Sequence, residues 1–162
     1  MDESWEKDAG CLRRCAAGDR EALRELTQRH GATVNGALHQ IIGDAQAADD
    51  ACVETFAAVW RGARRYNGRI SVKVWLYRHA VDVAMRAPLR FDAAGKSRLA
   101  TALGFLDRRE RAVLVLYYAA GLNVHEIAQV LRRPQCWVRY KMTAARRGLV
   151  EMDRCLTGSG SF

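Results

Sequence analysis

Apolar residues recur at helical spacing along most of this 162-residue chain, and only two prolines, Pro88 and Pro134, interrupt it. The clearest example follows the order i, i+3, i+4, i+7, i+8: Val34, Ala37, Leu38, Ile41 and Ile42. A stripe of this period forms the buried face of a helix. No segment alternates apolar and polar residues in the manner of a strand. The sequence therefore predicts an all-α fold.

Capping and turn signals predict where these helices begin and end. In the first half, helices are expected from Asp19 through His30, over 34–42, over 47–61, and from Ser71 to the stop at Pro88. In the second half, two capping boxes, D-x-x-E at 107–110 and N-x-x-E at 123–126, open helices that end at Tyr118 and Leu131. Pro134 stands at the expected first position of a last helix, which runs to about residue 152.

Breaks in this pattern predict two small helical domains joined by a short linker. We expect an N-terminal tail at 1–9, a helical domain at 10–88, a linker at 89–100, a second helical domain at 101–155 and a disordered tail at 156–162. The two helical units should form separate bundles, with no shared core across residue 95. A 12-residue linker spans about 40 Å at most.

Charge is distributed unevenly along the chain. The formal net charge is +8 and the pI about 9.7, but residues 1–60 carry −5 and residues 61–162 carry +13. A strongly basic part favours a polyanion such as nucleic acid, and an acidic part can contact a protein.

Several functional classes are excluded by what the sequence lacks. No apolar run of 18 residues predicts a membrane span, and the acidic N-terminus does not resemble a signal peptide, so we expect a cytoplasmic protein. The five cysteines form no C-x-x-C pair, and we interpret Cys11 and Cys15 as helix-packing residues. No nucleophile–base pair, phosphate loop or metal-ligand spacing occurs. We therefore expect no enzyme activity, cofactor or metal.

The segment 121–149 predicts a helix-turn-helix. A short capped helix, a tight turn and a longer basic helix follow one another. On the last helix, one face carries Val138, Met142, Ala145 and Leu149, and the opposite face carries Cys136, Tyr140, Thr143 and Arg147. Six Lys or Arg and no acid occur between residues 132 and 147. Such a helix suits the major groove of DNA.

The same half of the chain resembles region 4 of the sigma-70 family. The resemblance rests on LDRRERAVLVL at 106–116, GLNVHEIAQVL at 121–131 and ARRGL at 145–149. In that family this unit reads the −35 promoter element. The resemblance therefore implies the following −35 contacts: Arg133, Gln135, Trp137, Arg139, Tyr140, Lys141, Thr143 and Arg147.

The first half resembles region 2 of the same family. ADD at 48–50, ETF at 54–56 and Trp60 are similar to the part that docks on core RNA polymerase, which implies contacts from Asp50, Val53, Glu54, Phe56 and Trp60. WL at 75–76 and Ala80 are similar to the part that melts and reads the −10 element. Basic and aromatic groups suit that task, and the implied residues are Tyr66, Asn67, Arg69, Lys73, Arg78, His79 and Asp82.

With both regions adjacent, the chain resembles a compact sigma factor of the extracytoplasmic-function (ECF) type. The implied function is promoter-specific initiation, with core RNA polymerase, promoter DNA and an anti-sigma factor as partners of a free monomer. The family usually has Gln, Asn and Gly where Val53, Asp82 and Arg132 stand, and Gly-Thr at 136–137. Two alternatives stay open: a diverged sigma-like DNA-binding regulator, and a sigma mimic that titrates a sigma-binding partner.

Overall fold

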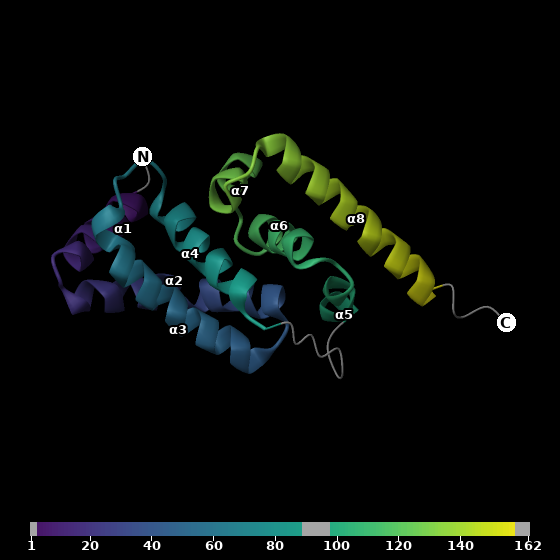
Figure 1. Ribbon diagram of the computed structural model, residues 1–162, viewed down its shortest axis with the longest axis horizontal. Coiled ribbons are helices and arrows are strands. Elements are labelled where there is room, and N and C mark those ends of the chain that lie inside the picture. Colours follow the sequence, from purple (N-terminus) through teal and green to yellow (C-terminus); the bar gives the residue numbers. More distant parts are fainter. Residues whose placement is uncertain (1–2, 89–97, 158–162) are drawn as a thin grey trace.

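All regular elements in the computed structural model are helices, across the residues that it describes, 3–88 and 98–157 (Figure 1). The helices are α1 (Glu3–Ala16), α2 (Arg20–Ile42), α3 (Ala45–Gly62), the short 3₁₀ helix η1 (Ala63–Arg65), α4 (Val72–Arg86), α5 (Arg98–Gly104), α6 (Arg108–Tyr118), α7 (Val124–Leu131) and α8 (Gln135–Thr157). The predicted all-α class is confirmed. Within those two ranges, none of the helices is long and apolar enough to cross a membrane.

Capping residues begin α2 and α4 where the sequence predicts, and α3 two residues before its expected start at 47. Asp19, Asp44 and Ser71 accept hydrogen bonds from backbone N–H groups in the first turns of α2, α3 and α4, at 2.9, 2.7 and 3.2 Å. Both expected capping boxes form completely, at the starts of α6 and α7. Each cap satisfies N–H groups that have no partner inside the helix.

Several predicted boundaries differ from the observed ones. The expected end of a helix at His30 is wrong, because α2 continues to Ile42 and keeps Leu26 and Val34 on one buried face. α1 begins at Glu3, inside the predicted tail, and α8 continues to Thr157. α5 starts inside the predicted linker, while residues 89–97 and 158–162 lie outside the described part of the chain.

The two helical units share one hydrophobic core, so the prediction of separate bundles is wrong. Buried apolar residues of α1–α4 and of α5–α8 form a single cluster. α7 packs along α4, and α6 packs against α2 (Figure 1). The physical reason lies in α4, which carries more apolar surface than one bundle can cover.

α4 is buried on two adjoining faces. The predicted stripe includes Leu76 and Ala80, which are 1% and 2% exposed. Val74, Tyr77 and Val81 form a second stripe at i, i+3 and i+7, and they are 1%, 4% and 4% exposed. At 100° per residue, this second stripe lies beside the side chains of α4 that contact α7.

Two arginines at the start of α6 bind the carboxyl ends of helices in the other unit. Arg108 Nη1 donates to the carbonyl oxygens of Ala84, Met85 and Ala87 at 2.9, 3.3 and 2.7 Å. Arg111, only 3% exposed, donates from Nη1 to the carbonyl oxygen of Ile41 at 2.7 Å. The last carbonyls of a helix lack partners within it and carry partial negative charge, so guanidinium groups suit them.

Candidate DNA-binding and polymerase-binding surfaces

α7 and α8 form the predicted helix-turn-helix. Val138, Met142 and Ala145 of α8 are 0%, 6% and 0% exposed and face the core. The remaining predicted contacts on the outer side are exposed: Arg139, Tyr140, Thr143 and Arg147. The helix therefore presents cations, an aromatic ring and a hydroxyl group on the face that points away from its own domain.

The start of α8 holds a partly buried aromatic side chain. Trp137 packs against the core, and the guanidinium of Arg133 lies 5.7 Å from the centre of its ring. Gln135, also exposed, lies with Nε2 3.1 Å from Nδ1 of His125 on α7. Trp137 is thus partly buried at the start of α8, and Arg133 is positioned over its ring.

Among the predicted −35 contacts, Lys141 forms ion pairs with two acids of the protein itself. Its Nζ donates to Asp107 at 2.8 Å and to Glu110 at 3.0 Å, the two acids of the capping box of α6. These hydrogen bonds raise the pKa of Lys141. The ammonium therefore ties α8 to α6.

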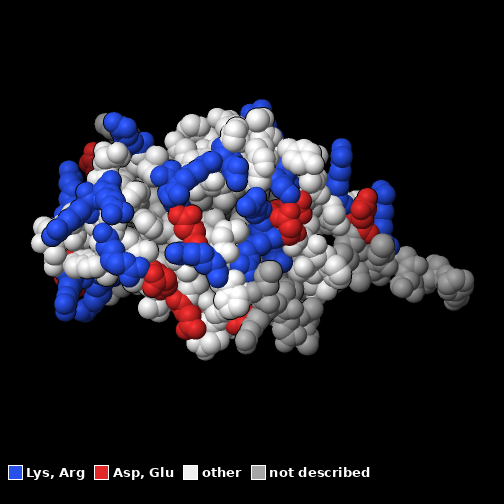
Figure 2. All heavy atoms as spheres, viewed as in Figure 1, with Lys and Arg blue, Asp and Glu red and all other residues white. Residues whose placement is uncertain are grey.

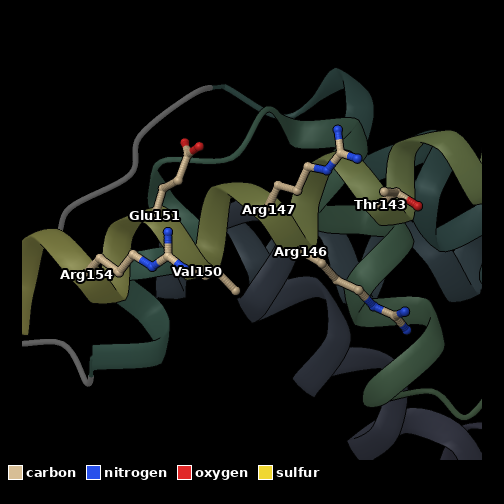
Figure 3. A pocket seen from close by; sticks show the side chains of 6 residues that line it. All are labelled: Thr143, Arg146, Arg147, Val150, Glu151 and Arg154. Atoms are coloured by element: carbon tan, nitrogen blue, oxygen red, sulfur yellow. The ribbon is translucent and has the colours of Figure 1, made fainter.

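The far half of α8 carries further arginines on a shallow depression of about 350 Å³ (Figure 3). Arg146 and Arg147 extend from neighbouring positions in different directions, and Thr143 lies one turn away (Figure 3). The guanidinium of Arg146 lies 5.8 Å from the ring centres of Tyr117 and Tyr118. Figure 2 shows Lys and Arg spread over this view of the molecule, with Asp and Glu in smaller groups among them.

An aromatic cluster surrounds the start of α4. Trp75 contacts the ring of Tyr66 at 5.5 Å and that of His79 at 4.8 Å between ring centres, both edge to face. Gly62 allows this close packing, since a Cβ there would lie 3.3 Å from His79 Nε2. Trp75 Nε1 and His79 Nε2 are buried without a hydrogen-bond partner, and burial lowers the pKa of His79. The imidazole is therefore biased towards its neutral form.

The predicted −10 residues divide into an exposed loop and a face of α4 that contacts the second unit. In the loop, Asn67 and Arg69 are exposed, and the hydroxyl of Tyr66 donates to the carbonyl of Ile70 at 2.9 Å. On α4, Arg78 Nη2 donates to the carbonyl oxygen of Gln129 on α7 at 2.7 Å. The remaining two also approach the second unit: Asp82 pairs with Arg132, and Lys73 lies beside Gly121.

The predicted polymerase-binding residues lie on α3, mostly on its outer side. Val53 is 74% exposed, the highest value among large apolar side chains of the described residues. Glu54 is exposed and pairs with Arg61 at 2.5 Å, and Asp50 is exposed as well. A depression of about 400 Å³ beside the two acids extends to the end of α4. Phe56, by contrast, is 6% exposed and belongs to the core, and Trp60 is half-buried.

Cys11 and Cys15 are buried in the core, as the packing interpretation predicts, and burial raises the pKa of both thiols. The sequence interpretation missed the roles of Arg108 and Arg111. A usable signal was present for Arg111, because it stands three and four residues before Leu114 and Val115 and so shares their buried face.

An exposed basic helix in a helix-turn-helix, attached to a second helical unit with an aromatic cluster and an acidic helix, defines a DNA-binding protein of transcription. Family models give the particular family: "Sigma-70 region 2" matches residues 26–93 and "Sigma-70, region 4" matches residues 102–149, together more than half of the chain. The chain belongs to the sigma-70 family, in the two-region ECF arrangement. The resemblance inferred from the sequence is confirmed.

Individual relatives agree with this assignment. RNA polymerase sigma factor NccH of Alcaligenes xylosoxydans xylosoxydans is 25% identical over 175 residues, which cover 90% of this chain and 94% of that protein. RNA polymerase sigma-H factor of Pseudomonas aeruginosa is 29% identical over 79 residues, which cover 49% of this chain and 41% of that protein.

Two solved structures share the fold. CnrH, solved in complex with the cytosolic domain of CnrY, is 26% identical and superimposes with a TM-score of 0.79 over 96% of this chain and 99% of that one. RpoE of Bartonella quintana, solved with the anti-sigma factor NepR, is 15% identical with a TM-score of 0.63, over 81% of this chain and 98% of that one. The similarity to RpoE shows the fold alone.

Proposed function

We propose that this chain binds core RNA polymerase and directs it to promoters, with α8 at the −35 element and the α4 surface at the −10 element. The observation that carries the proposal is the outer face of α8. Arg139, Tyr140, Thr143 and Arg147 are exposed there, opposite a fully buried stripe, in a segment that matches region 4. A helix of this kind fits the major groove and reads base edges.

Sequence reading by α8 can be tested by titrating the full chain with promoter and random DNA at two salt concentrations. If Arg139 binds a guanine, Arg139→Ala removes about 1–3 kcal/mol of discrimination against other bases at one or two positions. Arg24→Ala, an exposed arginine on α2 outside every proposed surface, is the control. Equal weakening on all DNA sequences would mean that α8 is only a basic anchor.

The outer side of α3 is our proposed contact for core polymerase. It combines Val53, an exposed apolar side chain, with the acids Asp50 and Glu54 and a depression beside them. Glu54→Lys should weaken binding to core polymerase in a pull-down without loss of helicity. Glu21→Lys makes the same charge change on an exposed part of α2 and should leave binding unchanged.

A diverged regulator without initiation activity is the second candidate function. It is favoured by the contacts of Arg78 and Asp82 with α7, which occupy part of the proposed −10 surface. Transcription assays with core polymerase separate the two functions. Absence of core binding at micromolar concentrations would favour the regulator.

An anti-sigma factor is the further partner that we propose. An apolar groove of about 510 Å³ is lined mainly by Leu103, Leu114, Val115, Tyr118, Leu149 and Val150, with Arg146 at its edge. An amphipathic helix with an acidic residue facing Arg146 would suit this surface. Support comes from CnrH, which is 26% identical to this chain and was solved in complex with the cytosolic domain of CnrY. Val150→Asp should abolish co-purification of such a partner.

A further inference from the structure

Arg132 holds a backbone conformation that arginine disfavours. It ends α7 with φ 52° and ψ 45°, in the left-handed region. Among the described residues, the other positions of positive φ are all glycines. A side chain at such a position crowds the backbone, and helices commonly end there on glycine. A strained residue of this kind is a reason to ask what its side chain does.

The side chain of Arg132 connects the two helical units. Its Nη2 lies 3.2 Å from Oδ2 of Asp82 on α4. Arg78, one turn before Asp82, donates to the carbonyl oxygen of Gln129 on α7. Asp82 therefore stands between two guanidinium groups and offsets their mutual repulsion. This pair gives the Arg132 side chain, and the acid on a face proposed to meet phosphate, a partner in the other unit.

The contact has a consequence for access to α4. In the observed arrangement α7 lies along the part of α4 that carries Lys73, Arg78 and Asp82. While α7 occupies that position, Arg78 and Asp82 are engaged by Gln129 and Arg132 and are not free to contact DNA. Separation of the two helices would release Arg78 and Arg132 together, and both could then bind phosphate in place of Gln129 and Asp82.

We propose that the Asp82–Arg132 pair is a latch that holds α7 over α4 and keeps this face of α4 from nucleic acid. The statement that this face binds nucleic acid rests on the proposed function. The existence of the latch does not depend on it. Both side chains are partly exposed, at 63% for Arg132 and 48% for Asp82, so the pair shifts the ratio of open to closed forms by about fivefold at most. High salt should weaken the latch by screening it.

The latch can be tested by the accessibility of a buried position on α4. Val81 is 4% exposed and lies on the second buried stripe. A thiol introduced by Val81→Cys should react with a soluble maleimide at a rate proportional to opening, which mass spectrometry measures residue by residue with native cysteines as references. If this variant does not fold, Val74→Cys on the same stripe takes its place, since Val74 is 1% exposed.

Asp82→Asn and Arg132→Gly should each speed this labelling up to about fivefold. The double variant should be no faster than the faster single one, because both remove the same interaction. Arg132→Gly should also leave the midpoint of thermal unfolding unchanged or higher, since glycine relieves the strain at position 132. Faster labelling without a lower midpoint of thermal unfolding would indicate that α7 separates locally from α4 and that the protein does not unfold as a whole.

The matched control is the exposed pair Arg24–Glu21 on α2, at 3.5 Å. Arg24→Gln and Glu21→Gln should leave the labelling rate unchanged. Unchanged labelling in Asp82→Asn and Arg132→Gly, or fully additive acceleration in the double variant, would overturn the latch.

Binding of single-stranded DNA separates the latch from the proposed function. If Arg132→Gly, which removes a cation, speeds labelling and still tightens binding, both the latch and the DNA-binding role of α4 stand. If it speeds labelling but binding does not change, the latch stands and the assignment of α4 as a DNA surface fails.

Discussion

We expect the replacement of Arg111 by methionine to destabilise the protein more than the same replacement of any exposed arginine. The guanidinium donates to three carbonyl oxygens: Leu103 at 2.9 Å, Ile41 at 2.7 Å and Leu106 at 3.2 Å. Methionine has similar length but no donor, so three buried acceptors lose this donor. Burial already disfavours the charged group, as the lowered pKa of Arg111 indicates, and its removal offsets part of the loss.

The expected magnitude follows from these opposing effects. Hydrogen bonds from a charged group contribute about 1.5–3 kcal/mol each, and recovery of the cost of burying the charge leaves a net loss of about 2–4 kcal/mol. Arg111→Lys should lose nearly as much, because one ammonium cannot reach three separated carbonyls as the planar guanidinium does.

Urea unfolding followed by circular dichroism measures this change. Arg109→Met is the matched control, since Arg109 is an exposed neighbour on the same helix, and its effect should stay within about 0.5 kcal/mol. Calorimetry of Arg111→Met should also show the single transition broadening or dividing, because Arg111 joins the two units. A loss under 1 kcal/mol for Arg111→Met would refute the reasoning.

Two further predictions concern charge. Burial raises the pKa of Tyr77 to about 12, from 10.0, so the unfolded chain ionises first. The free energy of unfolding should be unaffected well below pH 10 and should fall by about 2 kcal/mol as the pH rises from 10 to 12. Tyr77→Phe should remove that part of the fall in alkaline urea titrations. Lys141→Met should lower the free energy of unfolding by about 1 kcal/mol, because Asp107 and Glu110 lose their cation. The same replacement at the exposed Arg147 should leave the free energy of unfolding unchanged. Equal stability of the two variants would contradict the structural role of Lys141.

Local signals predicted most of the helices, while the packing between them could not be predicted. The caps at Asp19, Asp44 and Ser71 act within four residues, so their pattern is visible in the sequence. The second half of α2, past His30, packs against α3 and also against α6, which lies far along the chain. For the candidate site, α8 was predictable from its own periodicity.

Other residues of the candidate site bind partners that lie far away in the sequence, so these interactions could not be predicted from local patterns. Lys141 pairs with acids 31 and 34 residues earlier, and Arg78 donates to a carbonyl 51 residues later. Phe56 matched a surface motif by resemblance, yet it belongs to the core. The second stripe on α4, Val74, Tyr77 and Val81, was visible as a pattern, but only a partner helix explains why those residues are apolar.

The arginines at the start of α6 also limit how freely the two regions can be exchanged between related proteins. A chimera that keeps α1–α4 and receives its second region from elsewhere retains the carbonyls of Ile41, Ala84 and Ala87 at the junction. Unless the incoming region places guanidinium groups where Arg108 and Arg111 stand, these helix ends lose their donors. The DNA sequence preference that we propose for α8 should therefore be easier to transplant by changing the outer face of that helix than by exchanging whole regions.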